Sequence, residues 1–526
     1  MTFSASDFMM YSFFAMVTLA FWFPRNREKD GFLVMKYQKT SKQNPITQVS
    51  GHSWTSFEDI QYKLPNLNKP TSIHLDNFKF FKSNRTNKSG IDAILRTMPR
   101  RYRRRIEKKT KAYIEALTTT KGLVFVGEMG SGKTVTFNHL LSQNFYNRAL
   151  IHDAKMDYIK YFFRYGVDIL MNPFDSRNTV WDILSESPTT IETFFSNLMT
   201  AIAGGKIDYF SAAAQKKFRD IALKTTFLEG DPILKWKKFT QDVEDLFYEV
   251  KTSDQRSEKD VISSMDQVLD IFKLMSYQIQ NGQETFTIRG FFAKNNQNKI
   301  FLANNSEFEK SLNPLFGAFL ACFSQIHMSI PDTKKDLTLY LLDEYLSFAS
   351  IIDETSRRRL HTMIRSKGGM LYVGLQGIPG SDKKLEEDLT SSAFAYMIFS
   401  VKGKNNKAFV QTLIGIWKYQ KMNISKSNSG ETISWSEPEE KILEEAEIDM
   451  LAQDYSHVTI IPTEGILYKG TSPLIELTAR TEPFERYDLI PFVKHIIGSN
   501  EKFEERIKNE KNTDNKIAAA AANITK

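Results

Sequence analysis

The sequence predicts an α/β fold in which a mostly parallel sheet is interrupted by an all-helical insertion. Leu123–Val126 is a short apolar strand that is followed by a glycine-rich turn and a helix. Leu337–Leu342 is another apolar strand, much later in the chain, and two acids follow it. Between them, residues 187–280 have helical periodicity. Strands that alternate with helices at short spacing are typical of a parallel sheet covered on both faces.

The composition is that of a large globular protein. A chain of 526 residues is too long for one ordinary core, and 41% hydrophobic with 25% charged residues excludes a disordered chain. The single cysteine, Cys322, excludes an internal disulfide and a cysteine-based metal cluster, which fits a reducing compartment. The net charge of +8 is compatible with an anionic partner and equally with simple solubility.

The N-terminus predicts a membrane anchor. Residues 8–23 are uncharged and apolar, near the lower length limit for a bilayer-spanning helix. No Lys or Arg precedes them, which argues against a cleaved signal peptide. Arg25, Arg27 and Lys29 follow, so the positive-inside rule places the rest of the chain in the cytoplasm. The alternative is a buried or interfacial helix.

Residues 30–120 contain one distinctive feature, a basic cluster. Residues 99–105 read Pro-Arg-Arg-Tyr-Arg-Arg-Arg, and three lysines follow before residue 112. Such a cluster can bind nucleic acid or anionic lipid through phosphate contacts. A solvated helix face is an equally good explanation. Short apolar runs such as Ser72–Leu75 are expected to form edge strands.

The turn after the first apolar strand is a P-loop. It fits the pattern G-x-x-x-x-G-K-[ST] in full, with Gly127, Glu128, Met129, Gly130, Ser131, Gly132, Lys133 and Thr134. Glycines allow the backbone N–H groups to surround phosphates, and the following helix points its positive end at the anion. We expect Lys133 to reach the β- and γ-phosphates and Thr134 to bind Mg²⁺. The sequence therefore predicts a nucleoside triphosphate site.

Further strands are expected at Ala149–Asp153 and Asp168–Met171. Four helices follow within residues 187–280, and because they interrupt one sheet they must project from it, as a cap over the nucleotide core. The sheet then resumes with strands at Phe286–Ile288 and Lys299–Ala303, before a long apolar helix over Leu315–Met328.

The second acidic strand has the form of a Walker B motif. Asp343 would lie near Mg²⁺, and Glu344 would orient and deprotonate the attacking water. Such a strand end is a weak signal alone but a strong one beside a complete P-loop. Gln376 ends the next strand, where its amide would lie near the γ-phosphate and report hydrolysis by changing partners. Residues 423–440 are polar and serine-rich and are expected to form a loop.

Together these motifs resemble the TraD-like coupling proteins of conjugative type IV secretion systems, within the FtsK- and HerA-like P-loop ATPases. The resemblance spans about Gly122 to Arg486. Besides both Walker motifs, it includes His152–Lys155, Asn172–Arg177 with Trp181, the Phe286–Arg289 segment, and the arginine-glycine and glutamine motifs of residues 365–369 and 374–376. Met156 departs from the family, which often has glycine after the lysine.

The resemblance implies a RecA/FtsK-like core that assembles as a homo-hexamer at the bacterial inner membrane. It implies ATP and Mg²⁺ bound between subunits, with Arg365 completing the site of the neighbour, while Arg357–Arg359 lie close enough to compete for that role. The implied partners are single-stranded DNA that is bound independently of its sequence, relaxase proteins and components of the secretion channel. Relatives commonly have two membrane helices, whereas one is evident here.

This interpretation divides the chain into six parts. They are a membrane anchor (1–29), a basic membrane-proximal region (30–120), the first part of the nucleotide-binding domain (121–186), an all-α domain (187–280), the second part of the nucleotide-binding domain (281–497) and a charged tail (498–526). The leading hypothesis is an ATPase that drives DNA transfer in conjugation. The alternatives are an FtsK- or HerA-like DNA translocase and a nucleotide-dependent docking platform for secreted protein effectors.

Overall fold

The computed structural model describes residues 46–50 and, apart from short gaps, residues 122–498. Its main element is a nine-stranded sheet in the order β15-β14-β10-β2-β9-β8-β3-β7-β4. The strands are β2 (Gly122–Val126), β3 (Arg148–Asp153), β4 (Ile169–Met171), β7 (Asn298–Ala303), β8 (Thr338–Leu342), β9 (Gly369–Leu375), β10 (Ala393–Ile398), β14 (Ser456–Ile461) and β15 (Ile466–Thr471).

The strands from β10 to β4 are all parallel, whereas β14 and β15 are added antiparallel at one edge. The predicted α/β fold with a mostly parallel sheet is thus confirmed. The P-loop strand β2 and the acidic strand β8 are not direct neighbours, because β9 lies between them. The carboxyl ends of these three parallel strands meet at the same edge of the sheet.

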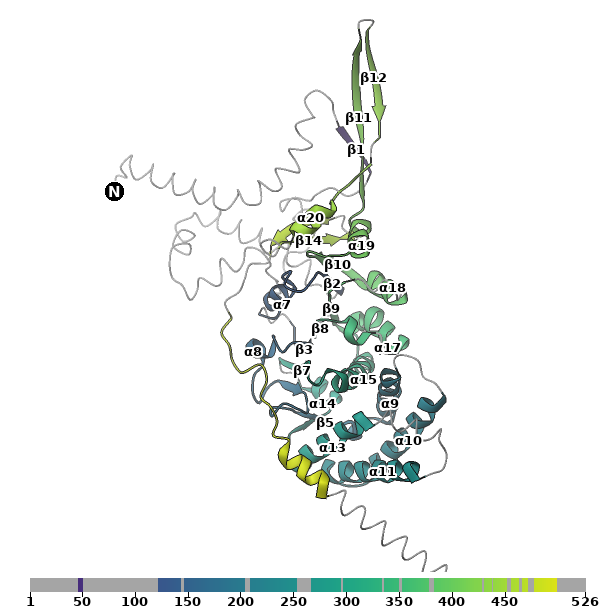
Figure 1. The fold of residues 1–526 in the computed structure, drawn as a ribbon, viewed down its shortest axis with the longest axis vertical. Coiled ribbons are helices and arrows are strands. Elements are labelled where there is room, and N and C mark those ends of the chain that lie inside the picture. Colours follow the sequence, from purple (N-terminus) through teal and green to yellow (C-terminus); the bar gives the residue numbers. More distant parts are fainter. Residues whose placement is uncertain are drawn as a thin grey trace, which may run out of the picture.

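Helices cover both faces of this sheet, as Figure 1 shows. Along β2, Leu123 and Phe125 belong to one buried cluster, while Val124 and Val126 belong to another. This alternation is the pleat of a strand that is buried on both sides. One face carries α7 (Lys133–Leu141) and α8 (Ile159–Phe162), and the other carries α15 (Glu309–Met328). The smaller helices are α16 (Leu346–Ala349), α17 (Glu354–Arg358), α18 (Lys383–Ser392), α19 (Lys404–Ile414) and α20 (Glu445–Met450).

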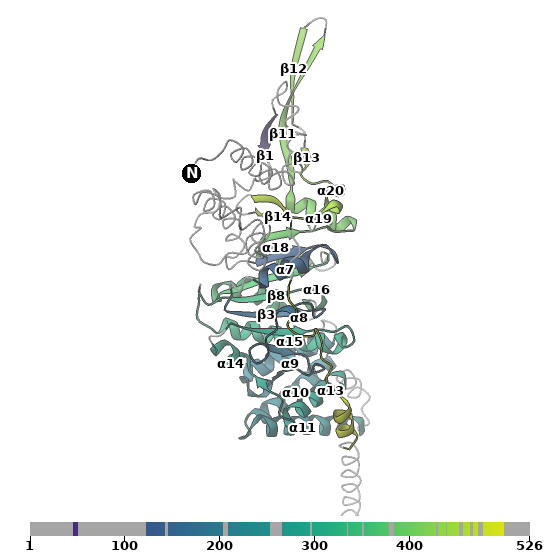
Figure 2. The ribbon, with the colours of Figure 1, turned by 90° about the vertical axis from the view of Figure 1, so that its left-hand side faces the viewer.

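Four long helices lie between β4 and β7 in the chain: α9 (Pro188–Ile202), α10 (Tyr209–Thr226), α11 (Pro232–Thr252) and α13 (Asp266–Gln280). Helix α9 begins with Ser187, whose side chain accepts the N–H of Thr190, and it packs along α15. Figures 1 and 2 both place α10, α11 and α13 at one end of the long axis, beyond β3, whereas α7 lies near the middle. The expectation of a cap over the nucleotide core is therefore wrong, because packing of α9 on α15 directs these helices to the end of the sheet.

The chain does not re-enter the main sheet at Phe286–Ile288 as expected. Residues Thr285–Phe286 form β6, which pairs with β5 (Val180–Trp181) in a separate two-stranded parallel sheet. The Thr287 hydroxyl then accepts the N–H of Gly290 at 3.0 Å and caps α14 (Ile288–Ala293). The apolar residues that predicted a strand instead include the buried face of a short helix, because Ile288 and Phe291 are both buried.

The polar stretch 423–440 is largely paired strand, and the loop expected there is wrong. Strand β11 (Ile416–Ser427) pairs antiparallel with β12 (Gly430–Ser436) and with β13 (Glu439–Lys441). Strand β1 (Ile46–Ser50) adds to the other side of β11. Figure 1 shows the β11–β12 ribbon projecting from the end of the molecule beyond α19. A projecting ribbon is held by backbone pairing and needs no apolar face toward a core, so its sequence lacks the usual strand signal.

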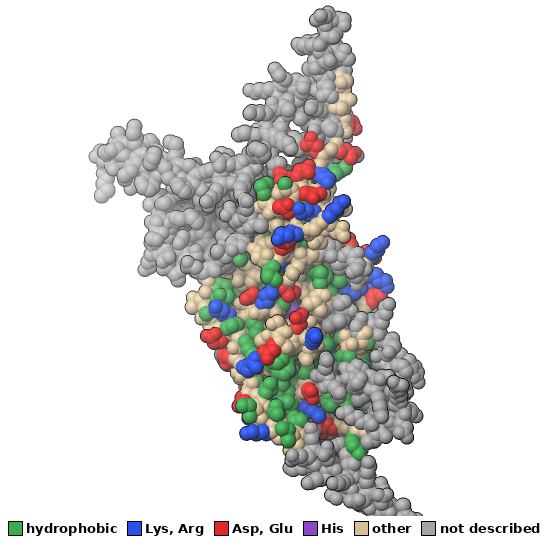
Figure 3. All heavy atoms as spheres, in the orientation of Figure 1, with side chains coloured by type: hydrophobic (Ala, Val, Ile, Leu, Met, Phe, Trp, Pro, Cys, Tyr) green, Lys and Arg blue, Asp and Glu red, His purple; other side chains and the backbone are tan. Residues whose placement is uncertain are grey.

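Several expectations lie outside the described residues. These are the anchor at 8–23, the edge strands around 72–75, the basic cluster at 99–111 and the tail from 501. Within the described part of the chain, no helix combines the length and apolar character that spanning a bilayer requires. On the face that Figure 3 shows, basic and acidic side chains are interspersed rather than gathered by sign.

Candidate nucleotide site

The P-loop turns sharply between β2 and α7 because its glycines adopt conformations that other residues avoid. Gly130 has φ of 78° and Gly132 has φ of 110°. A Cβ atom on Gly127 would lie 2.6 Å from both Ser131 Oγ and the side chain of Phe399. The N–H of Gly127 donates to the carbonyl of Leu375 at 3.0 Å, which ties the loop to the end of β9.

The remaining loop residues close the turn. The Ser131 hydroxyl donates to the Glu128 carbonyl at 2.8 Å, and the Glu128 side chain pairs with Lys402 at 3.0 Å. Met129 at the tip is 71% exposed, so it does not hold the turn in place by packing. The loop is therefore held by backbone and polar contacts, and its tip faces solvent.

Lys133 lies buried at the start of α7 with its ammonium under the loop. Nζ donates to the carbonyl oxygens of Gly127 and of Glu128, the second at 2.9 Å. Burial lowers the pKa of Lys133, and the nearby Asp343 carboxylate opposes this shift. The P-loop lysine and the Walker B aspartate are therefore close enough to interact, as the sequence predicted.

Tyr158 lies beside the two residues that were expected to bind magnesium. Its hydroxyl donates to Oδ2 of Asp343 at 2.7 Å and lies near the Thr134 side chain. Tyr158 is 1% exposed, so this phenol is held within the core. Burial raises the pKa of the Asp343 carboxyl, while the Tyr158 hydrogen bond and the Lys133 charge act in the opposite direction.

The Asp343 carboxylate occupies space that a glycine leaves open on β9. A Cβ atom on Gly374 would lie 2.5 Å from Asp343 Oδ1 and 3.1 Å from the Phe137 ring. The N–H of Glu344 donates to the same Oδ1 at 3.0 Å, and His152 Nδ1 donates to the Asp343 carbonyl at 2.7 Å. Asp343 is thus positioned from three strands, β3, β8 and β9.

Glu344 follows Asp343 in a left-handed backbone conformation, with φ of 53°. Such strain in a residue other than glycine is uncommon and clusters at functional sites. Its Oε1 accepts a hydrogen bond from Gln376 Nε2 at 2.7 Å and pairs with Lys155 Nζ at 2.8 Å. The amide of Gln376 therefore contacts the proposed base, a partner that the sequence did not predict.

The β3–α8 turn, residues 153–159, is the part of the site that sequence reasoning largely missed. The buried Asp153 carboxylate accepts backbone N–H groups of Asp157, Tyr158 and Ile159 at 2.8 to 2.9 Å. Met156, where the family often has glycine, keeps the left-handed conformation with φ of 58°, and its side chain is buried. The signal for this turn in the sequence was a strand that ends in Asp153 and is followed by Lys155 and Tyr158.

Arg365 lies away from the other predicted residues. It is exposed on a 3₁₀ turn (Ile364–Lys367) that precedes β9, whereas Gln376 follows that strand. A seven-residue strand spans about 23 Å, so Arg365 is at the opposite edge of the sheet from the P-loop of its own chain. The competing Arg357 is buried and pairs with Asp388 at 2.9 Å.

The Asn172–Arg177 segment has a structural role in the described chain. The Arg177 guanidinium pairs with Asp175 at 2.6 Å, and both side chains are buried. Arg177 also donates to the carbonyl oxygens of Glu482 at 2.7 Å and Pro483 at 3.1 Å. This motif therefore fastens the C-terminal segment to the sheet at a distance from the P-loop.

The residues present fit a magnesium ion that is held chiefly by phosphate oxygens. Thr134 offers a hydroxyl and Asp343 a carboxylate, both beside the Tyr158 hydroxyl, and Mg²⁺ prefers such oxygen ligands. The described residues contain no cluster of three or more His, Cys, Asp or Glu that could hold a metal ion without the nucleotide. The ion and the triphosphate would thus bind together.

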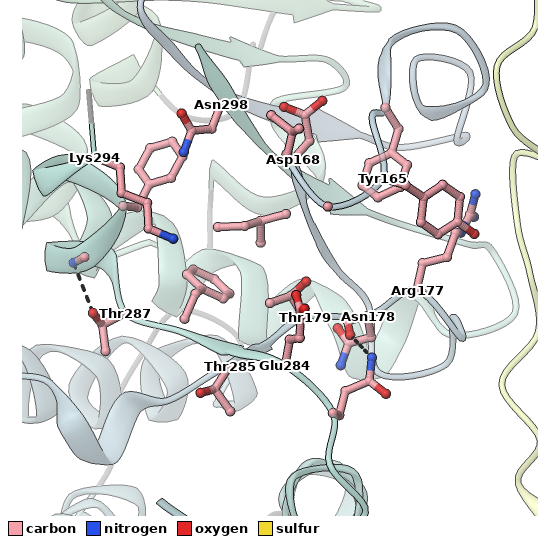
Figure 4. A pocket seen from close by; sticks show the side chains of 18 of the residues that line it. Tyr165, Asp168, Arg177, Asn178, Thr179, Glu284, Thr285, Thr287, Lys294 and Asn298 are labelled. Carbon is pink, nitrogen blue, oxygen red and sulfur yellow. Dashed lines mark hydrogen bonds between the residues drawn. The ribbon is translucent and has the colours of Figure 1, made fainter. Parts of the chain in front are cut away.

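A hollow of about 590 Å³ lies between β4 and the β5–β6 sheet and is drawn in Figure 4. Two charged side chains of its lining, Asp168 and Arg177, are engaged within the protein. Asp168 accepts from Arg164 at 2.8 Å and lies 3.6 Å from Lys299, and Arg177 pairs with Asp175. Among its lining residues there is no strand-to-helix glycine turn comparable to the P-loop.

Comparison with known proteins identifies the family of this chain. Residues 113–434 match the model described as the type IV secretion-system coupling protein DNA-binding domain. The chain belongs to this family. It is also 21% identical over 308 residues to the coupling protein TraD of Escherichia coli strain K12, a match that covers 54% of this chain and 41% of TraD. The chain thus spans less than half the length of that relative.

Solved structures of the bacterial conjugative coupling protein TrwB share the fold. The unbound monoclinic form of TrwBdeltaN70 gives a TM-score of 0.59 at 18% identity, covering 83% of this chain and 96% of that one. TrwB in complex with ADP and Mg²⁺ gives 0.58 at 17% identity, covering 84% and 98%. TrwB in complex with the non-hydrolysable ATP analogue ADPNP gives 0.58 at 16% identity, covering 84% and 97%.

Proposed function

We propose that this coupling protein hydrolyses ATP to move DNA, with its attached relaxase, to a type IV secretion channel during conjugation. The observation that carries the proposal is the meeting of Lys133, Asp343 and Glu344 at one edge of the sheet. Family membership and the TrwB complexes with nucleotide support the same activity. In the proposal the chain acts as a homo-hexamer, anchored in the inner membrane by residues 8–23.

The residues have separate tasks in this reaction. The P-loop amides and Lys133 bind the phosphates, and Thr134 with Asp343 hold Mg²⁺, which supplies charge neutralisation at the phosphates. Glu344 orients the attacking water and accepts its proton. Gln376 fixes the Glu344 carboxylate through their hydrogen bond of 2.7 Å.

Arg365 is assigned to the site of the neighbouring subunit. Its exposure and its place at the far edge of the sheet are consistent with action in trans and not on its own nucleotide. Mixing Arg365→Ala with Glu344→Gln subunits should restore part of the ATPase activity, because some interfaces would then combine an intact arginine with an intact base. An absence of recovery at every mixing ratio would count against this assignment.

The main test is ATPase activity of the full-length protein in detergent micelles, with and without single- and double-stranded DNA. DNA should stimulate the ATPase activity of the wild type. The affinity of the protein for DNA should fall steeply as the salt concentration rises. Lys133→Ala should lose nucleotide binding, while Glu344→Gln should bind ATP without turnover. Lys310→Ala, which removes an exposed lysine on α15, is the matched control. Normal turnover by Glu344→Gln would refute the assignment of the base, and activity without any DNA response would favour the docking platform.

The anchor is tested separately. Deleting residues 1–30 should release the protein from membranes into the soluble fraction. Persistent membrane association of the truncated protein would show that another segment binds the bilayer.

A further inference from the structure

The β3–α8 turn supplies one partner to each of the two Walker B acids. Tyr158 donates to Asp343, and three residues earlier Lys155 pairs with Glu344 at 2.8 Å. Tyr158 is 1% exposed, whereas the side chains of Lys155 and Glu344 are 47% and 26% exposed. The exposed Lys155–Glu344 ion pair can therefore be replaced by another contact more easily than the Tyr158–Asp343 hydrogen bond can.

An ion pair as exposed as Lys155–Glu344 contributes little to stability, because water screens the two charges. A triphosphate carries several negative charges, so it can compete with Glu344 for the Lys155 ammonium. Little free energy is lost when the exposed ion pair breaks. Lys155 Nζ lies 2.8 Å from Oε1 of Glu344, which is the residue expected to orient the water that attacks the γ-phosphate. The Lys155 ammonium is thus near the place where a γ-phosphate would bind.

The backbone that carries Lys155 is firmly held. The Asp153 carboxylate accepts three backbone N–H groups of the turn, and the buried Met156 side chain fixes the residue that follows the lysine. A lysine has a flexible four-carbon stem, so its ammonium can change partner while its Cα stays in place. The turn therefore holds the Lys155 backbone in place while the Lys155 ammonium is able to move.

We propose that Lys155 is a positioning residue that is shared between the Glu344 carboxylate and the γ-phosphate of ATP. When Lys155 turns to the phosphate, Glu344 keeps only its hydrogen bond from Gln376 and is free to accept a proton from water. Because ADP has no γ-phosphate, Lys155 should distinguish ATP from ADP. This inference rests on the proposed function of the site and assigns a role to a residue outside both Walker motifs.

Equilibrium binding of the ATP analogue AMP-PNP and of ADP, both with Mg²⁺, tests the proposal on the full-length protein. Lys155→Met should weaken AMP-PNP binding about tenfold, as expected for the loss of one charged hydrogen bond, and change ADP binding by less than about twofold. Lys155→Arg should restore most of the AMP-PNP affinity, since it keeps the charge. Lys160→Met is the control, because the Lys160 ammonium lies over the Tyr161 ring on the adjacent helix α8.

A double-mutant cycle separates the shared lysine from simple charge repulsion. Glu344→Gln should tighten AMP-PNP binding, because it releases Lys155, and this gain should vanish in the Lys155→Met/Glu344→Gln variant. A gain that persists in the double variant would overturn the proposal, since removal of the carboxylate charge would then explain it. Equal loss of AMP-PNP and ADP binding in Lys155→Met would also overturn it, in favour of a structural role.

The outcome also separates this inference from the function it rests on. Failure of the wild type to bind either nucleotide would overturn both. Normal wild-type binding with an AMP-PNP to ADP ratio that Lys155→Met leaves unchanged would overturn the role of Lys155 alone.

Discussion

Tyr158 and Asp343 are joined by a hydrogen bond of 2.7 Å between residues far apart in the chain, and the Thr134 side chain lies near the same phenol. The Tyr158 hydroxyl thereby fixes Asp343, which is proposed to bind magnesium together with Thr134. Because Tyr158 is on the β3–α8 turn, the geometry of the metal site depends on a segment outside both Walker motifs.

Removing this hydroxyl should weaken magnesium binding in a pH-dependent way. The Tyr158 hydrogen bond lowers the pKa of Asp343 against the raising effect of burial, so Tyr158→Phe should raise that pKa further. More Asp343 would then carry a proton at acid pH and compete with the ion. We expect the variant to need several-fold more Mg²⁺ for AMP-PNP binding, with a larger defect at about pH 6 than at about pH 8. An unchanged magnesium requirement at both pH values would contradict this.

Gly374→Ala should impair the site while leaving the fold intact. The added Cβ would lie 2.5 Å from Asp343 Oδ1, so the carboxylate must move. We expect weaker Mg²⁺-dependent nucleotide binding with nearly unchanged far-ultraviolet circular dichroism. Gly498→Ala is the matched control, because nothing lies within 4 Å of its added Cβ. Equal binding by both variants would show that Asp343 tolerates the displacement.

At Met156, substitution by glycine should destabilise the protein less than substitution by alanine, which reverses the usual order. Both Met156→Ala and Met156→Gly lose the buried side chain, which costs about 2 kcal/mol. Only glycine relieves the left-handed backbone at φ of 58°, which is worth about 1 kcal/mol. The glycine variant should therefore have the higher urea midpoint. A more stable alanine variant would indicate that the backbone relaxes out of this conformation.

The Asp175–Arg177 pair should control attachment of the C-terminal segment. Arg177→Met leaves a buried carboxylate without its main partner, a change that typically costs about 3 to 5 kcal/mol. We expect faster limited proteolysis near residues 480–486, whose carbonyl oxygens Arg177 binds. The Asp175→Asn/Arg177→Met variant should be less destabilised, since no charge is left buried. Equal stability of the single variant and the wild type would refute this role.

The sequence by itself determined the parts of the site whose signal is local. The P-loop is one continuous stretch with a strand before it and a helix after it, so its turn needs no distant contact to be recognised. The acidic end of β8 and the period of the four inserted helices are likewise carried by neighbouring residues. These features are set by local backbone conformation and by burial of one face.

Only the tertiary structure decided which distant residues meet. Lys155 and Tyr158 reach the Walker B acids because β3 and β8 are neighbours, a pairing that no local pattern encodes. The insertion of β9 between β2 and β8 also depends on strand order. The ribbon of β11 and β12 was missed because backbone pairing between its strands holds it, whereas sequence patterns report burial. Contacts between separate segments arise from the packing of the whole chain, so their partners become visible only after it folds.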